Sequence, residues 1–185
     1  MVLCFDSGDK MIDRSLNYGR HVIRRFLKEI APYEHVLDIG AGAGVDLGIA
    51  REICLAAKLS AVEVFPQSVA LLRENSVDVY SLNIERGLLP FSEGVVDVVI
   101  ANQILEHTKE VFWIFHEVSR ILPMHGHFIV GVPNLAALHN RILLALGRQP
   151  SSIKTCSAHV RGFTRDDLLR FVEVCFPGGY QLVGF

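Results

Sequence analysis

The sequence has few cysteines, and no two of them are spaced as a redox or zinc-binding pair. Its four cysteines, at positions 4, 54, 156 and 175, form no C-x-x-C motif. This pattern argues against a disulfide-rich scaffold and against a zinc-finger framework. We therefore expect a reducing compartment, the cytoplasm, and a structural role for a thiol such as Cys54.

Long apolar runs and an excess of charge are also missing. No apolar run approaches the roughly 18 residues that a membrane helix needs, and residues 1–10 lack the basic and apolar segments of a signal peptide. The 18 basic and 20 acidic residues leave a net charge of −2, without the basic excess typical of nucleic-acid-binding domains. We expect no membrane span and no nucleic-acid partner, and a small-molecule substrate is favoured.

The sequence does contain enough apolar residues for one globular domain. Half of its 185 residues are hydrophobic and 21% are charged, so residues 1–185 are expected to form a single domain. Short apolar runs alternate with segments of helical spacing, which is typical of a three-layer α/β/α domain with a mainly parallel sheet. Strands are predicted over 36–39, 59–64, 77–82, 95–101, 127–134 and 180–185, and helices over 15–31, 45–57, 66–75, 112–122, 135–146 and 165–175. Residues 1–14 show neither pattern and are expected to form a flexible arm.

One stretch carries the clearest functional signal, a short apolar run that leads into three alternate glycines. The pattern D-x-G-x-G-x-G starts at Asp38, and helical spacing begins directly after it, at Val45. Such a turn points backbone N–H groups at a ligand, and glycine avoids the Cβ that would block both the turn and the ligand. A dinucleotide-binding loop would need its third glycine at position 45, where this chain has valine.

This loop resembles motif I of the class I S-adenosylmethionine-dependent methyltransferases. A second stretch adds to the resemblance, because the β-branched run 95–101 is followed by Leu105-Glu106-His107, as after the fourth strand of many small-molecule methyltransferases. The resemblance covers residues 15–185 and implies a Rossmann-like methyltransferase fold with S-adenosylmethionine as cofactor. The family sheet has seven strands, and the last is not found in this sequence. An uncovered sheet edge would then remain, through which a homo-oligomer could form.

The resemblance assigns cofactor contacts to the ends of four strands. Glu63 ends the second strand, nineteen positions after Gly44, close to the spacing of about 20 residues expected of a ribose-binding carboxylate. Such a carboxylate can accept hydrogen bonds from both ribose hydroxyls. At the third strand Asn83 and Glu85 are alternative partners for adenine, with Ile84 beside the ring. The complete expected cofactor set is Asp38, Gly40, Ala41, Gly42, Gly44, Glu63, Val64, Asn83, Ile84, Glu85, Asn102 and Gln103.

On the acceptor side, the resemblance points to two histidines. His107 closes the L-E-H segment, and His159 opens an H-x-R-x-F-T segment, so both are candidate general bases. The alternative is that they fix their loops by hydrogen bonding. Arg161 and an inserted helix and loop over residues 135–158 are expected beside the acceptor. The N-terminal helix would bring one more group of candidates close to the cofactor, namely Tyr18, Arg20 or His21.

No resident metal ion is expected. The histidines that lie close together in the sequence, His116, His125 and His127, flank a turn or sit on a helix, without a carboxylate in a ligand pattern. The expected cofactor is therefore S-adenosylmethionine alone.

The expected function is transfer of a methyl group from S-adenosylmethionine to an O, N or C nucleophile of a small molecule. A non-catalytic cofactor-binding or interaction module with the same fold is the main alternative, and an NAD-dependent oxidoreductase is a lesser one. An RNA methyltransferase is also less favoured, because residues 102–105 read Asn-Gln-Ile-Leu where such enzymes carry an N-P-P-Y-like motif.

Overall fold

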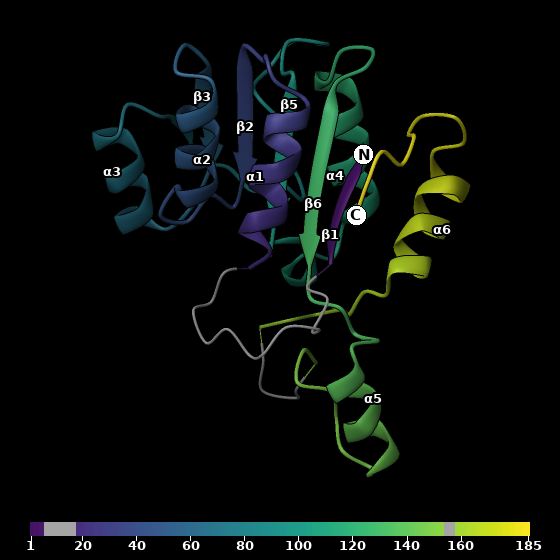
Figure 1. The fold of residues 1–185 in the computed structure, drawn as a ribbon. Coiled ribbons are helices and arrows are strands. Elements are labelled where there is room, and N and C mark those ends of the chain that lie inside the picture. Colours follow the sequence, from purple (N-terminus) through teal and green to yellow (C-terminus); the bar gives the residue numbers. More distant parts are fainter. Residues whose placement is uncertain (6–17, 154–157) are drawn as a thin grey trace.

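In the computed structural model, one parallel sheet lies at the centre of the molecule (Figure 1). The structure describes residues 1–5, 18–153 and 158–185. Within them six strands pair in the order β1-β6-β5-β2-β3-β4, and every pairing is parallel. The strands are β1 (Val2–Phe5), β2 (His35–Ile39), β3 (Lys58–Val62), β4 (Asp78–Tyr80), β5 (Val98–Asn102) and β6 (His127–Val132). The predicted parallel α/β architecture is confirmed.

Helices cover both faces of the sheet (Figure 1). They are α1 (Arg20–Glu29), α2 (Val45–Ile53), α3 (Pro66–Glu74), the 3-10 helix η1 (Leu105–His107), α4 (Val111–Ile121), α5 (Leu138–Ala145) and α6 (Arg165–Cys175). Side chains alternate along each strand, so that Val98 and Ile100 pack with α1 and α2, whereas Val99 packs with α4 and α6. This alternation produces the three predicted layers.

The strand order reverses between β2 and β5. From β2 the chain proceeds through β3 to β4 on one side, and β5, β6 and β1 lie on the other side. In open parallel sheets ligands bind at the carboxyl ends of the strands at such a switch point. The glycine loop follows β2, and Asn102 ends β5, so these members of the predicted cofactor set lie at the switch point.

Both chain ends differ from the sequence prediction. Residues 1–14 were expected to form an arm, but Val2–Phe5 forms β1, with Val2 opposite Ile129 of β6. The sequence prediction missed this strand because its four residues do not alternate between apolar and polar side chains. Such a short segment can still form a strand by pairing with the open edge of β6. Residues 6–14 lie outside the described residues. The strand expected over 180–185 is also wrong, because in this segment only Gly184 takes part in a β-bridge and no strand forms.

The C-terminal segment instead runs beside Met1. The Met1 amine donates a hydrogen bond to Gln181 O at 2.8 Å, and Val183 N donates to Met1 O at 3.1 Å. The edge of β6 that the sequence left uncovered is therefore occupied by β1, with the last residues of the chain alongside.

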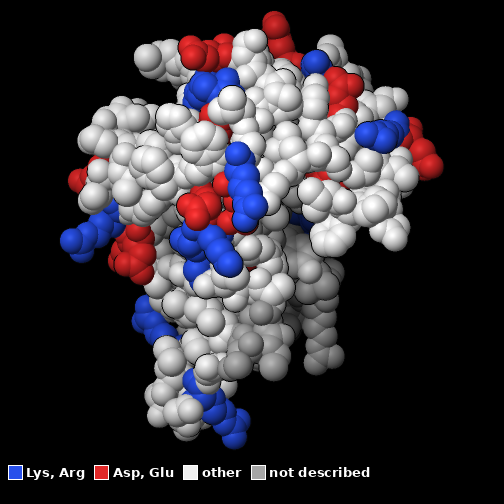
Figure 2. All heavy atoms as spheres, turned by 180° about the vertical axis from the view of Figure 1, so that it is seen from behind, with Lys and Arg blue, Asp and Glu red and all other residues white. Residues whose placement is uncertain are grey.

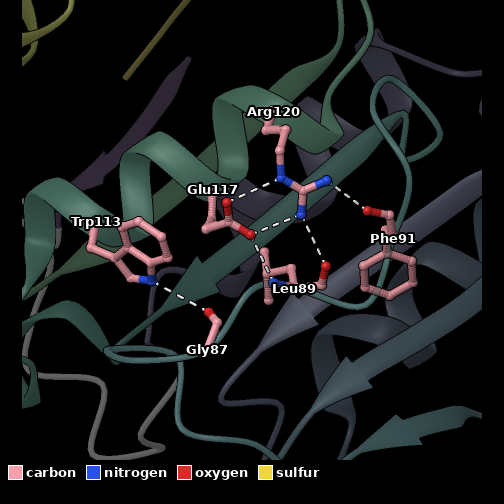
Figure 3. A network of polar contacts seen from close by, with 6 residues as sticks. All are labelled: Gly87, Leu89, Phe91, Trp113, Glu117 and Arg120. Atoms are coloured by element: carbon pink, nitrogen blue, oxygen red, sulfur yellow. Dashed lines mark hydrogen bonds and ion pairs between the residues drawn. The ribbon is translucent and has the colours of Figure 1, made fainter.

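A polar network fixes the loop of residues 87–91 to α4 (Figure 3). The Glu117 carboxylate, 1% exposed, accepts hydrogen bonds from Leu89 N and from the Arg120 guanidinium. Arg120 also donates to the carbonyl oxygens of Leu89 and Phe91, at 2.9 and 2.7 Å. Burial is the largest single influence and opposes the charge on Glu117, but the hydrogen bonds from Arg120 and Leu89 N and the Arg120 charge together outweigh it, so the pKa of Glu117 is lowered.

Helix α5 extends away from the sheet (Figure 1). It carries half-exposed and exposed apolar side chains, such as Leu138 at 73% and Ile142 at 51%. From behind, this projection shows basic side chains and no acidic ones (Figure 2), in agreement with Arg141 and Arg148 in the sequence. Within the described residues, no helix combines the length and the apolar character needed to cross a membrane.

Candidate functional site

The glycine loop between β2 and α2 has the backbone conformation that its sequence predicts. Gly40, Gly42 and Gly44 have φ values of +75°, +53° and +75°, a region that strongly favours glycine. A Cβ on Gly40 would lie 2.8 Å from the Ile104 side chain, and one on Gly44 would lie 2.6 Å from Leu72. A Cβ on Gly42 would meet nothing within 4 Å, so the centre of the loop borders open space.

Glu63 holds this loop against the end of β3. Its carboxylate, in a residue only 5% exposed, accepts hydrogen bonds from Gly42 N at 2.7 Å, Val64 N at 2.7 Å and Phe65 N at 2.9 Å. A carboxylate has about four acceptor positions, so this arrangement leaves one, on Oε2, for a ribose hydroxyl. Glu63 and Val64 therefore lie where the sequence predicts, and Glu63 also shapes the loop.

Buried acidic and amide side chains gather beside the loop. Asp46, in the first turn of α2, accepts hydrogen bonds from Arg20 Nε and from Asn102 Nδ2, both at 3.0 Å. Asp38 lies close enough that the Asp46 charge acts on it; burial raises the pKa of Asp38 well above its ordinary value, and Asp46 raises it further. Asp38 Oδ2 and Asn102 Oδ1 are buried and accept no hydrogen bond from the described residues. Two buried acceptors are thus available to a ligand that carries donors.

The end of β5 depends on a glycine in the next strand. A Cβ on Gly131 of β6 would lie 2.2 Å from Asn102 Oδ1, so only glycine leaves room for this amide. The following residue, Gln103, has φ +58°, and its N–H donates to Gly131 O at 2.7 Å. Such a conformation is uncommon for a residue other than glycine and is found at functional sites.

The three residues predicted to contact adenine have different surroundings. Asn83 is exposed, and its Oδ1 accepts from Glu85 N at 2.9 Å within its own turn. Ile84 packs against the core under α4. The Glu85 carboxylate accepts from Lys109 N and from Glu110 N at the start of α4. Of the two polar candidates, Glu85 is therefore already engaged by α4, whereas Asn83 faces solvent.

The two candidate bases lie together on one side of this site. The ring centroids of His107 and His159 are 4.7 Å apart. His107 Nδ1 also donates a hydrogen bond of 3.2 Å to the carbonyl oxygen of Ala158, which lies 51 residues further along the chain. Arg161 follows on the same segment and donates to Lys109 O. Residues 154–157, within the predicted insertion, lie outside the described residues.

Several residues of the site were missed in the sequence. Asp46 could have been found from the sequence, since an acid in the first helical turn directly after a glycine loop can reach a ligand bound at that loop. Gly131 had a weaker signal, because a glycine inside a strand often marks close approach of another group. Arg20 was one of three candidates on its helix, and only its hydrogen bond to Asp46 distinguishes it. Phe65, 67% exposed beside Glu63, had no signal.

Comparison with known families supplies the identification. The family model described as "Methyltransferase domain" matches residues 37–130, just over half of the chain. The chain belongs to this methyltransferase family. The matched range runs from β2 to β6 and so contains the glycine loop, Glu63 and Asn102. The class I methyltransferase family predicted from the sequence is thereby confirmed, and the match does not favour an NAD-dependent oxidoreductase.

A curated relative and solved structures agree with this assignment. The chain is 31% identical over 161 residues to an arsenite methyltransferase of Halobacterium salinarum, covering 83% of this chain and 39% of that protein. A S-adenosylmethionine-dependent methyltransferase of Archaeoglobus fulgidus has the same fold (TM-score 0.64, 18% identity, 85% of this chain and 68% of that one). So does the plantazolicin methyltransferase BpumL in complex with S-adenosylhomocysteine (TM-score 0.66, 14% identity, 90% of this chain and 66% of that one). The chain spans less than two fifths of the length of the curated relatives that it matches.

The described residues of this methyltransferase domain fit the family cofactor, S-adenosylmethionine. Its methionine end carries an ammonium group, and Asp38 Oδ2 and Asn102 Oδ1 are buried acceptors without a partner. Its ribose carries hydroxyl donors, and Glu63 keeps one acceptor position open. Its adenine is apolar on both faces, and Val64 and Phe65 expose 57% and 67% of their surface next to Glu63.

Proposed function

We propose that this domain transfers a methyl group from S-adenosylmethionine to a nucleophilic O, N or C atom of a small molecule in the cytoplasm. The observation that supports it most is the pair of unpartnered acceptors on Asp38 and Asn102 beside a glycine loop at the switch point of the sheet. Burying an acceptor without a partner costs about 1–3 kcal/mol, a cost that a bound donor offsets.

The chain's own residues have mainly a positioning task. The sulfonium of the cofactor makes its methyl group electrophilic, so the protein has to align the acceptor with it and exclude water. Asp38 and Asn102 hold the ammonium end, and Glu63 holds the ribose. Asn83 is the proposed partner of the adenine amino group, because Glu85 is engaged at α4.

We place the acceptor beside His107 and His159. In this proposal an imidazole nitrogen removes the proton from a hydroxyl acceptor, whereas an already acidic acceptor needs no base. The part of the insertion 135–158 that the structure describes is proposed to influence acceptor choice.

Calorimetric titration with S-adenosylhomocysteine tests the cofactor assignment. We expect micromolar binding, no binding of NAD, and at least tenfold weaker binding by Glu63→Ala. A matched control is Glu74→Ala, an exposed acid at the end of α3, which should bind as the unmodified chain does. Absence of binding to a folded chain would contradict the proposal.

Turnover separates the enzyme from the non-catalytic module. If the domain binds the cofactor, a panel of hydroxyl, amine and carbon acid acceptors is incubated with it and S-adenosylhomocysteine production is measured. Product formation that is lost in His107→Ala and His159→Ala supports methyl transfer with these residues on the acceptor side. Binding without turnover over the whole panel favours the module.

A further inference from the structure

We propose that Glu106, His107 and His159 form a binding site for a divalent transition-metal ion, with Zn²⁺ as the expected occupant. Each residue offers one ligand atom, and these atoms lie within 4.8 Å of one another. Within the described residues this is the group of histidine and acidic side chains gathered closely enough to share a metal ion. The sequence does not predict this site, because His159 comes from a segment far from Glu106 and His107.

Backbone hydrogen bonds bring that segment to η1. The carbonyl oxygen of Glu106 accepts from Val160 N at 2.8 Å and from Arg161 N at 3.4 Å. These bonds place His159 against His107, with ring centroids 4.7 Å apart and ring planes at 77°. Main-chain hydrogen bonds between residues 160–161 and Glu106 therefore hold the two histidines close together, in addition to the contact between their rings.

The hydrogen bonds of the two rings leave the ligand nitrogens free. His107 Nδ1 is 3.2 Å from Ala158 O, and His159 Nδ1 is 2.6 Å from Ser152 O. A carbonyl oxygen can only accept, so in both rings Nδ1 must carry the hydrogen. In the neutral imidazole the lone pair then lies on Nε2. A metal-bound histidine typically has this arrangement, in which the other ring nitrogen donates to a carbonyl or carboxylate.

The Glu106 carboxylate provides a second observation, independent of the two histidine rings. Glu106 is 2% exposed, and its Oε2 is buried without a hydrogen-bond partner. A buried carboxylate oxygen is costly unless a cation or a donor satisfies it. Neither imidazole donates to it, although each ring has a nitrogen within 4.8 Å of the Glu106 carboxylate. A cation shared with the two Nε2 atoms would satisfy this oxygen.

The donor set indicates the class of metal. Two imidazole nitrogens and one carboxylate oxygen suit Zn²⁺ and neighbouring transition metals, whereas Mg²⁺ and Ca²⁺ prefer oxygen ligands. Metal–ligand bonds of about 2.0–2.1 Å require the three atoms to approach to roughly 3.3 Å, so a bound ion would draw them closer than the present limit of 4.8 Å. Three protein ligands leave a further position open for water or for an acceptor atom.

The open position has a consequence that rests on the proposed function. A hydroxyl acceptor bound there would lose its proton more easily, because the metal stabilises the anion. The histidines would then act as metal ligands, and the metal would replace them as the means of acceptor activation. Metal binding itself does not depend on this step.

Metal titration tests the site without cofactor or acceptor. The chain is freed of metal with a chelator, titrated with Zn²⁺ in a calorimeter and with Co²⁺ in an absorption spectrometer. We expect one ion per chain, bound at micromolar concentration or tighter, and intense visible Co²⁺ bands typical of four or five ligands. No binding, or only the weak bands of six-coordinate Co²⁺, would overturn the proposal.

Variants assign the ligands. His107→Ala, His159→Ala and Glu106→Gln should each weaken Zn²⁺ binding at least tenfold, whereas His116→Ala, an exposed histidine on α4, should leave it unchanged. Equal Zn²⁺ affinity in all four would overturn the proposal. If His107→Ala does not fold, as judged by circular dichroism, His107→Gln replaces it. Titration of the same samples with S-adenosylhomocysteine separates the two proposals, since either ligand can bind while the other does not.

Discussion

At Gly131 the absence of a side chain makes room for the amide of Asn102. We predict that Gly131→Ala weakens S-adenosylhomocysteine binding at least tenfold, because a Cβ would lie 2.2 Å from Asn102 Oδ1 and displace it. Calorimetric titration measures the effect. The control is Gly48→Ala on α2, where a Cβ would meet nothing within 4 Å, and unchanged binding in Gly131→Ala would show that Asn102 has no part in the site.

Asp38 illustrates the cost of a binding residue in the unliganded chain. Its pKa is raised by burial and by Asp46, so its ionised form destabilises the fold once the pH exceeds its pKa in the unfolded chain, ordinarily about 3.9. We predict that Asp38→Asn increases the free energy of unfolding by about 1–3 kcal/mol at neutral pH and weakens cofactor binding. The stability gain should vanish as the pH falls toward 4.

Chemical denaturation at several pH values measures this difference. Asp78→Asn, an exposed residue paired with Lys58 at 3.3 Å, is the control and should change stability little, because exposed ion pairs contribute about 0–1 kcal/mol. A loss of stability in Asp38→Asn at neutral pH would contradict the prediction.

At the scale of the elements, Glu117 and Arg120 join α4 to the loop 87–91 (Figure 3). The pKa of Glu117 is lowered in the folded chain, so its contribution to stability is complete above its ordinary pKa and is lost as the pH falls through the folded value. We predict that Glu117→Gln lowers the free energy of unfolding by about 1–3 kcal/mol at neutral pH, with a smaller effect in acid. Thermal unfolding measures it.

The matched control for Glu117 is Glu110→Gln, at the exposed start of the same helix. It should shift the unfolding midpoint much less. An equal shift in both variants would mean that the network in Figure 3 contributes no more than an exposed acid.

The elements also show how far sequence reasoning reaches. Buried parallel strands are apolar along their whole length, so β2 and β5 are evident from the sequence. The N-cap of α6 is also a local pattern, a threonine before two acids, and the Thr164 hydroxyl accepts from Asp167 N at 3.2 Å. The glycine loop was equally evident, since its pattern is local. By contrast, the hydrogen bond from Glu110 N to Glu85 and the close approach of Asn102 to Gly131 are contacts between segments that are distant in the sequence. Local sequence patterns do not predict such tertiary contacts.

For the whole molecule, the least local strand pairing is that of β1 with β6. We predict that deletion of residues 1–5 lowers stability and causes concentration-dependent association, because it uncovers the backbone edge of β6. Sedimentation at several concentrations measures association. Replacing residues 2–5 by four β-branched residues keeps the backbone pairing and is the control. A deletion variant that stays monomeric and equally stable would contradict the prediction.

The same pairing has a consequence for the order of folding. It joins residues 2–5 to residues 129–132, so a loop that contains about two thirds of the 185 residues must close before the edge strand gains a single hydrogen bond. The centre of the sheet can form first, from β2, β3 and β5, and the edge is added last. In the native protein, amide hydrogens of β1 should then exchange with solvent sooner than those of β2, through local openings that leave the cofactor site intact.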